Sequence, residues 1–318
     1  MNSRMLAIFL VLAAVSVAGN PIIVDRAPAP ADLFALGDIH GDLDRARRLL
    51  TVTGLVNETG WTGGRDILVV TGDMIDKGPQ SLGVLRFLST LRVQAAKAGG
   101  EVIVLAGNHE VEFLANPSGS KSREFGDELR SAGYDPANVA KCQGEIGEIL
   151  CSLPFAARVG DWFFSHAGNT SGRTLAEVTR AIRDGMASQG YAAPELIDTS
   201  SILEARLGDG KKWIGSNGEN ERLSTYANAL GVHHIVQGHQ HGEVTFSDGI
   251  KRNAGEVFQR WGLLFLIDVG MSRDIGDSSG AILRIRSGAS SAICPDGTEA
   301  LIWSEAGAQD VGRALPCH

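Results

Sequence analysis

The most informative residues of this chain are aspartate, asparagine and histidine residues that stand beside glycine in five short segments. Each segment directly follows a short apolar run of the kind that forms a buried strand. Strands of α/β proteins carry functional side chains at their carboxyl ends, so we expect the five segments to meet at one edge of a single sheet. The segments are Gly37–Gly41 (GDIHG), Gly72–Gly78 (GDMIDKG), Gly107–Glu110 (GNHE), Ser165–Gly168 (SHAG) and Gly238–His241 (GHQH).

The side chains in these segments offer oxygen and nitrogen donors that suit two divalent metal ions. Carboxylate, amide oxygen and imidazole are ligands of Mn, Fe or Zn, and the segments contain no cysteine, which argues against a closed structural zinc site. Two ions about 3.5–4 Å apart need a bridging ligand, for which Asp73 is the candidate. We expect Asp38, His40 and Asp73 to hold one ion, and Asp73, Asn108, His166 and His239 to hold the other. A bridging hydroxide in such a centre suits in-line attack on phosphorus.

His109 directly follows the candidate ligand Asn108, so its side chain should point elsewhere, toward a leaving group. This position favours a general acid, and the alternative is a residue that only orients the ligands. An acidic imidazole needs an orienting carboxylate, and Asp76 is the candidate. We expect Glu110 to support the ligands without binding metal.

The charge and the N-terminal end of the chain bear on its location. The net charge of −8 argues against binding to nucleic acid or to an anionic membrane. Arg4, the apolar stretch Met5–Val17 and the small residues around Ala18 predict a signal peptide over residues 1–19, and an uncleaved anchor is the alternative. Residues 20–31 are expected to form a leader without periodicity. We therefore expect an exported protein, periplasmic or secreted, with no membrane association after cleavage.

An exported protein can form disulfides. The four cysteines allow three pairings, of which the simplest joins Cys142 to Cys151 and Cys294 to Cys317. Reduced thiols in a cytosolic protein are the alternative.

The rest of the pattern predicts an α/β fold in one catalytic domain over residues 32–318. Helical periodicity from Asp42 to Thr53 and from Pro79 to Ala98, between the apolar runs, predicts parallel strands with right-handed crossovers. Residues at about 116–152 interrupt this rhythm; we interpret them as an insertion over the metal face that sets substrate specificity, or as a surface excursion without a role. The strand-rich last third indicates a second sheet packed on the first.

Taken together, the five segments resemble the motifs of the phosphoprotein phosphatase family, within the calcineurin-like metallophosphoesterase superfamily. Residues 37–50, 108–111 and 265–272 are most similar to the Shewanella-like bacterial-type phosphatases. The resemblance covers about residues 32–286. It implies a central β-sandwich of mixed sheets flanked by helices, a dinuclear metal site, and hydrolysis of phosphomonoesters without a phosphoenzyme. It also implies the ligand set given above, with His109 as acid and Asp76 as its orienting partner.

Two departures from the family pattern concern substrate and metal binding. Lys77 stands where the family has arginine, which keeps the charge but loses the bidentate fork, and we expect Lys77 to contact phosphate. His241 completes a GHxH ending that the wider superfamily uses for an additional ligand, so His241 is a further metal-ligand candidate. Arg252 and Arg273 are further candidates for binding phosphate.

The sequence therefore predicts an exported metallophosphoesterase whose partner is a phosphorylated protein, including phosphotyrosine, or a phosphorylated small molecule. A phosphodiesterase or a dinucleoside polyphosphate hydrolase using the same centre is the alternative, and the GHxH ending leans that way. A binding module without catalysis would be expected to lack ligands, and none is missing from the pattern.

Overall fold

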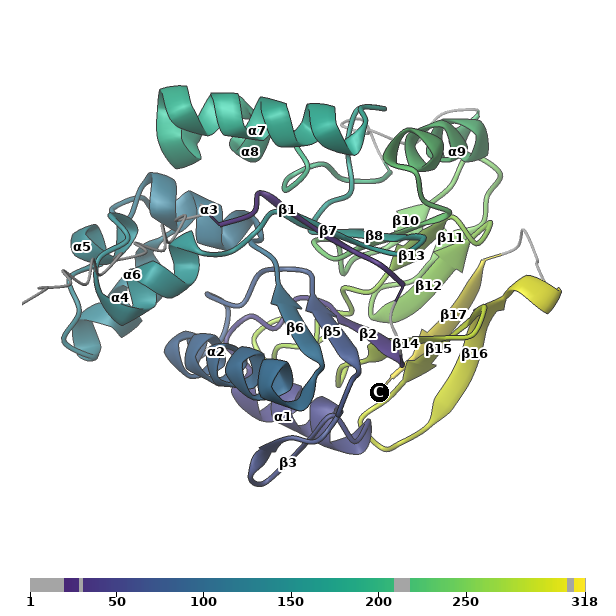
Figure 1. Ribbon diagram of the computed structural model, residues 1–318, viewed down its shortest axis with the longest axis horizontal. Helices are drawn as coiled ribbons and strands as arrows, with labels where there is room; N and C mark the ends of the chain where they lie inside the picture. Colours follow the sequence, from purple (N-terminus) through teal and green to yellow (C-terminus); the bar gives the residue numbers. More distant parts are fainter. Residues whose placement is uncertain (1–19, 29–30, 209–217, 308–311, 318) are drawn as a thin grey trace, which may run out of the picture.

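The structure is a computed structural model that describes residues 20–28, 31–208, 218–307 and 312–317. Two β-sheets form its centre, with helices on the outside (Figure 1). The predicted signal peptide, residues 1–19, lies outside the described residues. No helix within the described ranges has the length and apolar character needed to cross a lipid bilayer.

One sheet has six strands in the order β16-β15-β14-β2-β5-β6. Strands β2, β5 and β6 are parallel, as the β-α-β pattern predicts, and β14 extends them antiparallel to β2. Every residue of β2 and β5 is buried, because this sheet is covered on both faces. The strands are β2 Leu33–Leu36, β5 Ile67–Val70, β6 Glu101–Val104, β14 Ile282–Arg286, β15 Ala289–Ile293 and β16 Glu299–Ser304.

The other sheet has seven strands in the order β1-β7-β8-β9-β13-β12-β17. Strands β8, β9 and β13 are parallel, while β7 and β12 run antiparallel to their inner neighbours β8 and β13. The strands are β1 Ile23–Arg26, β7 Ala156–Val159, β8 Trp162–Ser165, β9 His234–Gln237, β12 Glu256–Arg260, β13 Leu264–Leu266 and β17 Arg313–Pro316. Two short hairpins lie outside both sheets, β3 Val56–Asn57 with β4 Gly60–Trp61 and β10 Val244–Thr245 with β11 Lys251–Arg252.

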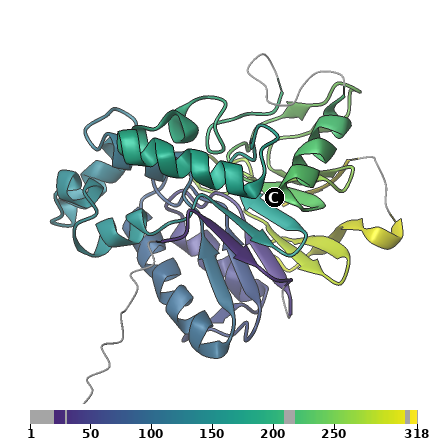
Figure 2. The same ribbon diagram turned by 45° about the horizontal axis from the view of Figure 1, so that its top comes forward.

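Helices cover the two sheets from opposite sides. Helix α1 (Leu43–Val52) begins after Asp42, whose side chain accepts a hydrogen bond from Arg45 N, and packs near α2 (Ser81–Ala98). Figures 1 and 2 show α1 and α2 on one side of the molecule, α7 and α9 on the other, and α4, α5 and α6 as a separate group at one end. The remaining helices are α3 Asn108–Ala115, α4 Arg123–Ser131, α5 Pro136–Ala140, α6 Gly144–Cys151, α7 Leu175–Gln189, α8 Pro194–Ile197 and α9 Glu219–Leu230, with short 3-10 turns at Gly190–Ala192 and Glu305–Gly307.

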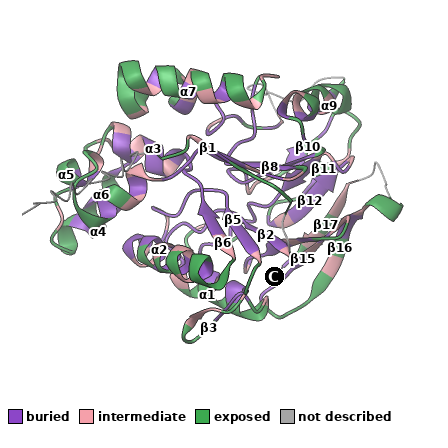
Figure 3. Ribbon diagram, viewed as in Figure 1, coloured by how far each residue is buried: buried purple, intermediate pink, exposed green. Residues whose placement is uncertain are grey.

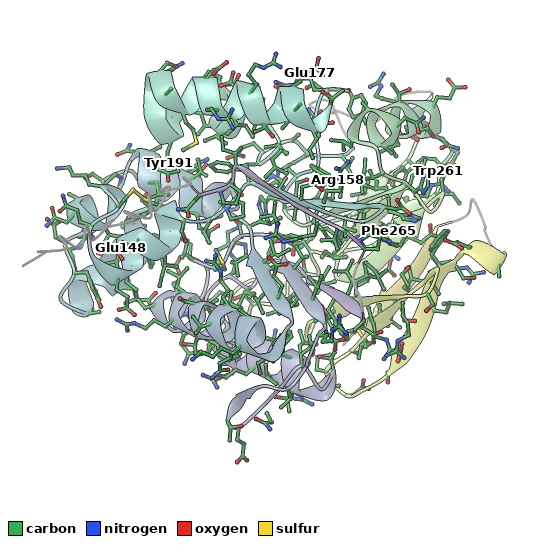
Figure 4. All side chains as sticks on the ribbon, viewed as in Figure 1. Glu148, Arg158, Glu177, Tyr191, Trp261 and Phe265 are labelled. Carbon is green, nitrogen blue, oxygen red and sulfur yellow. A yellow bond between two sulfur atoms is a disulfide. The ribbon has the colours of Figure 1, made fainter. Side chains whose placement is uncertain are left out.

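The hydrophobic core fills the space between the sheets and under the helices. Figure 3 shows the central strands as buried and the outer faces of α2, α4 and α7 as exposed. Phe265 is fully buried in β13, whereas Glu177 points outward from α7 (Figure 4). The core therefore holds the strands, and hence their carboxyl ends, in a rigid frame.

The expectation that the five polar segments share one sheet is wrong. Strands β2, β5 and β6 belong to the six-stranded sheet, but β8 and β9 belong to the seven-stranded sheet. The last third of the chain also divides, since β14, β15 and β16 extend the first sheet while β12, β13 and β17 complete the second. The rule of adjacent parallel strands holds only for consecutive β-α-β units, and the helices after β6 carry the chain into the second sheet.

Two further regions that interrupt the β-α pattern contain regular elements. Within the predicted leader, Ile23–Arg26 forms β1 and pairs parallel with β7. The predicted insertion at about 116–152 contains α4, α5 and α6. The predicted cysteine pairing is confirmed, since Cys142 joins Cys151 within the insertion and Cys294 joins Cys317.

Candidate metal centre and active site

Tight turns after the strands bring the predicted ligands together. Among the described residues, nine non-glycine residues have positive φ, and five of them lie in these turns. A non-glycine residue in this region is strained, and such strain persists where the surrounding structure holds it. The five are His40, Asp73, Asp76, Lys77 and His239. The strained backbone positions therefore lie within the same segments that the sequence motifs identify as the candidate site.

His40 and Asp73 form one side of the cluster. The Nδ1–H of His40 faces the carbonyl of Ile75 at 3.1 Å, which leaves Nε2 directed at Asp73 Oδ2, 3.5 Å away. A backbone carbonyl on one ring nitrogen is the usual way to orient the other nitrogen toward a metal. Both residues are buried, so their polar atoms face each other and not bulk water.

Asn108, His166 and His239 form the other side. His166 places Nδ1 3.0 Å from the carbonyl of Thr71, so its Nε2 faces Asn108 Oδ1 at 3.0 Å and Asp73 Oδ2 at 3.3 Å. His239 Nδ1 lies 3.1 Å from both Asn108 Oδ1 and His166 Nε2. Three potential metal-ligand atoms thus lie together beside Asp73. They come from α3, from the end of β8 and from the end of β9.

Asp38 contacts the backbone of His239 and thereby joins the cluster. Its two carboxylate oxygens each accept from the backbone N–H of His239 at 3.1 Å, and Oδ1 lies 4.0 Å from His166 Nδ1. Burial and the neighbouring carboxylate of Asp268 raise the pKa of Asp38 well above its usual value. Burial opposes a charge on His166, yet Asp73 and Asp38 raise the pKa of that ring to about 10. The buried carboxylates therefore attract positive charge into this cluster.

The donor set fits a pair of divalent metal ions. Two groups of potential ligands lie within the described residues, His40 with Asp73 and His109, and Asp73 with His166 and His239; in each group the ligand atoms are within 4.8 Å of one another. Asp73 is common to both groups, as a bridging carboxylate requires. The atoms are carboxylate oxygen and imidazole nitrogen, with Asn108 adding an amide oxygen, which suits Mn, Fe or Zn.

His109 and Asp76 form a hydrogen-bonded pair beside this cluster. His109 Nδ1 lies 2.8 Å from Asp76 Oδ2, while its Nε2 lies 3.9 Å from Asp73 Oδ2. Burial lowers the pKa of His109, but Asp73 and the hydrogen bond to Asp76 outweigh burial and leave the pKa raised. The carboxylate of Asp76 thus holds Nδ1 of the His109 ring, while Nε2 of the same ring faces Asp73 in the cluster.

Glu110 organises the turn that carries Asp73. Its fully buried carboxylate accepts hydrogen bonds from the backbone N–H groups of Asp73, Met74, Ile75 and Gly107 at 2.8–3.1 Å. One side chain therefore joins the GDMID turn to the GNHE turn. This is a supporting position of the kind expected for Glu110 from the sequence, since its oxygens face backbone groups.

Two glycines allow the segments to approach this closely. A Cβ at Gly107 would lie 2.1 Å from Asp73 Oδ1, and a Cβ at Gly238 would lie 2.2 Å from Asp38 Oδ1. Neither position would accept a side chain without moving a carboxylate of the cluster. The glycine that recurs beside each polar residue thus reflects close packing of one turn against another.

Lys77 and Arg206 supply the nearby positive charge. Burial lowers the pKa of His40 to about 4 and the Lys77 ammonium acts in the same direction; its charge also opposes protonation of His109. Burial likewise lowers the pKa of His239, with His166 and the exposed Arg206 adding to the effect. The two cations therefore act from different sides of the cluster. Sequence reasoning missed Arg206, because it lies in an irregular stretch with no motif or spacing to single it out.

The other two predicted substrate-binding residues, Arg252 and Arg273, are paired with protein groups in the structure. Arg252 is fully buried, and its guanidinium donates to the carbonyls of Glu256, Gln240, Gly242 and Asp268, so it braces loops and has no donor directed at a phosphate. Arg273 is half exposed and pairs with Asp42 and Asp44.

His241 does not join the cluster either. Its Nδ1 pairs with the carboxylate of Asp277, and it belongs to neither ligand group. A lone Arg or His in a loop carries too little pattern to fix where its side chain points.

A β-sandwich with buried carboxylates, histidines and an asparagine at converging strand ends defines the class of metal-dependent α/β hydrolases. The family of calcineurin-like phosphoesterases matches residues 32–243, which is well over half of the chain. The chain belongs to the calcineurin-like phosphoesterase family. The resemblance and the fold expected from the sequence are thereby confirmed.

Relatives and solved structures agree with this family. The chain is 40% identical to Shewanella-like protein phosphatase 2 of Arabidopsis thaliana over 93 residues, 29% of this chain and 24% of the relative. It is 34% identical to a symmetrical bis(5'-nucleosyl)-tetraphosphatase of Acidovorax sp. (strain JS42) over 203 residues, 62% of this chain and 64% of the relative. The chain thus spans less than two thirds of either relative.

The fold is also that of a cold-active protein-tyrosine phosphatase of a psychrophilic Shewanella. The TM-score is 0.65 at 24% identity, and the match covers 89% of this chain and 82% of that one. At this level of identity the similarity establishes the architecture alone.

Proposed function

We propose that this protein is a metal-dependent phosphatase that hydrolyses phosphomonoesters on a protein or a small molecule. The observation that carries the proposal is the pair of ligand groups that share Asp73, with the His109–Asp76 pair directly beside them. Membership in a phosphoesterase family supports the same reaction class.

The metal ions would be held by the six residues of the cluster, Asp38, His40, Asp73, Asn108, His166 and His239. When bound, two divalent ions neutralise phosphate charge and lower the pKa of water, which supplies a nucleophile at neutral pH. Lys77 and Arg206 draw the phosphate toward the cluster, because both carry positive charge next to its histidines.

His109 donates the proton that the leaving oxygen needs. Asp76 accepts from Nδ1 at 2.8 Å, which fixes the ring and favours its protonated form, so the proton at Nε2 faces the substrate side. Despite burial of the ring, the carboxylates of Asp73 and Asp76 raise the pKa of His109, which favours the protonated ring that a general acid needs.

The second candidate is a dinucleoside polyphosphate hydrolase that uses the same cluster. The similarity to the Acidovorax tetraphosphatase over 203 residues favours it. The two substrates differ in the leaving group, a protein or alkyl alcohol in one case and a nucleotide phosphate in the other. A direct comparison of the two substrate types separates the candidates.

Purified protein supplied with Mn²⁺ should be assayed on a phosphotyrosine peptide, a phosphoserine peptide, a phosphodiester and a dinucleoside tetraphosphate. We expect the highest kcat/KM on a phosphomonoester. His109→Ala should lower kcat by about 10²–10⁴ on phosphoserine and much less on p-nitrophenyl phosphate, whose leaving group needs little protonation. A preference for the dinucleoside tetraphosphate would replace the proposed function by the second candidate, and an equal loss on both monoesters would remove His109 from the acid role.

We also propose that the protein acts outside the cytoplasm. The expected signal at 1–19 and two disulfides among the described residues support an oxidising compartment. Intact mass before and after reduction should show a mature chain that starts near Gly19 and gains four hydrogens. Four free thiols in the exported protein would contradict the disulfides, and an uncleaved N-terminus would contradict this location.

A further inference from the structure

The insertion at 116–152 meets the active site through helix α4. The N-terminal residue that should cap α4, Ser122, makes no side-chain bond to the first turn of the helix. Instead the N–H of Phe125 in that first turn donates to Asp76 Oδ1 at 2.9 Å. The carboxylate that holds His109 with one oxygen therefore caps α4 with the other.

In return, carboxylates of α4 accept hydrogen bonds from the segment that contains Asp76 and the start of α2. Helix α2 also begins without a side-chain cap at Gln80. The N–H groups of Ser81 and Leu82 donate to the carboxylate of Glu128 on α4, at 3.1 and 2.9 Å. The N–H of Gly78 donates to Glu124 Oε1 at 3.0 Å. Helix α4 thus supplies acceptors for free N–H groups at the start of α2 and in the turn before it, and Asp76 of that turn supplies the acceptor for the start of α4.

Helix α4 also contacts the element that carries His109. The rings of Phe125 in α4 and Phe113 in α3 meet edge to face, with centroids 4.9 Å apart, and both are fully buried. Since His109 lies in the first turn of α3, α4 is packed against the helix of the acid and hydrogen-bonded to the turn of its partner. The residue in that turn, Asp76, has φ of 60°, a conformation that surrounding contacts must maintain.

We propose that α4 is a positioning element for the Asp76–His109 pair, with Glu124 and Glu128 as the positioning residues that act through the turn at 76–82. This rests on the proposed function, because it assigns α4 to the proton-transfer step of that reaction. It gives the insertion a role different from both alternatives raised by the sequence, a specificity element over the metals or an excursion without function. Glu124 and Glu128 touch neither the substrate nor the metal ligands; they hold the backbone on which Asp76 and Lys77 are mounted.

The test compares Glu124→Gln, Glu128→Gln and the double variant with Asp127→Asn. Asp127 lies on the same helix, and its substitution removes the same charge as one Glu→Gln change, but its carboxylate is 65% exposed and pairs with Arg130 of that helix. We expect the double variant to lower kcat on a phosphoserine peptide by roughly tenfold and on p-nitrophenyl phosphate by less than about twofold. The KM and the metal content of the double variant should equal those of the parent protein. Asp127→Asn should have the parent's kcat on both esters.

Asp76→Asn, measured alongside, distinguishes failure of the α4 proposal from failure of the proposed function. If Asp76→Asn discriminates between the esters and the double variant does not, the α4 proposal is overturned and the proposed function stands. If neither variant discriminates, the acid role and the α4 proposal both fail. An equal loss on both esters in the double variant, with metal content reduced, would show a merely structural helix; if the double variant does not fold, the two single variants decide by the same ratio.

Discussion

The two sheets contribute unequal halves to the candidate site. The six-stranded sheet supplies Asp38, His40, Asp73, Asn108 and His109 from consecutive β-α units between residues 33 and 115. The seven-stranded sheet supplies only His166 and His239, from strands separated by α7, α8 and α9. The first half thus arises from local chain order, and the second half requires the sheets to pack correctly.

The halves also differ in how they are supported. In the first half, Glu110 holds the turns from within that part of the chain, and α4, which follows it, contacts Asp76. In the second half, the orienting groups come from the first: the Thr71 carbonyl holds His166, and the Asp38 carboxylate accepts from the N–H of His239. The first half should therefore keep its geometry when the second is damaged, whereas damage to the first should disturb both.

The largest effect should come from Asp73→Asn, which removes the carboxylate common to both ligand groups found among the described residues. A neutral amide cannot bridge two divalent ions as a carboxylate does, so we expect both metals to be lost or weakly held and turnover to be abolished. Metal analysis by mass spectrometry on the dialysed variant measures this. Two full equivalents of metal with near-normal activity would remove Asp73 from the bridging role.

His40→Ala and His239→Ala sharpen that result, because each removes a ligand from one half only. We expect His239→Ala to lose about one of two metal equivalents, because the self-supporting half still holds the other metal, and we expect His40→Ala to lose more than one, because damage to the first half disturbs both. If His239→Ala loses both metals while His40→Ala retains one, the direction of support is opposite to the one described.

A smaller effect should come from the two cations that act on different halves. Lys77→Met should raise KM for a phosphomonoester roughly tenfold, since a charge-assisted hydrogen bond is worth about 1.5–3 kcal/mol. Arg206→Met should raise it less, because Arg206 is exposed and its interaction is screened by water. Metal content should not change in either variant.

Arg273→Met serves as the control, since Arg273 pairs with Asp42 and Asp44. Lys77→Arg should be tolerated because it keeps the charge. An unchanged KM and unchanged inhibition by inorganic phosphate in Lys77→Met would place the phosphate contact elsewhere.

The smallest effect concerns stability, at the end of β9 opposite the metal cluster. His234 stacks on Trp162 at a centroid distance of 4.0 Å, and burial lowers its pKa to about 4. The unfolded chain has an ordinary histidine pKa near 6.5 and binds the proton first, so stability is fully present above about pH 6.5 and falls as pH drops toward 4. The loss has an upper bound of roughly 3 kcal/mol.

Urea unfolding of metal-free protein at several pH values between 4 and 7 measures this dependence. His234→Gln should flatten it, whereas His233→Gln, with a side chain 75% exposed, should not. An unchanged slope in His234→Gln would show that other groups cause the acid sensitivity.

Although it left three cysteine pairings open, the sequence alone determined the family, the parallel β2-β5-β6 unit and the candidate residues of the metal centre. These rest on short-range pattern: a buried strand followed by a glycine turn can be recognised without knowing what it packs against. The same pattern predicted the neighbours Asp76 and His109 as a pair, and the structure places them 2.8 Å apart.

Only the tertiary structure decided which sheet each strand joins and where isolated side chains point. Arg252, Arg273 and His241 are single residues outside the motif pattern, and their partners in the structure are backbone carbonyls or aspartates that the sequence does not reveal. The contacts between α4 and the segment 76–82 could not be predicted either, because they join N–H groups at 78–82 to carboxylates more than forty residues away. Such contacts depend on how helices dock, and docking leaves no periodic signature in the local sequence.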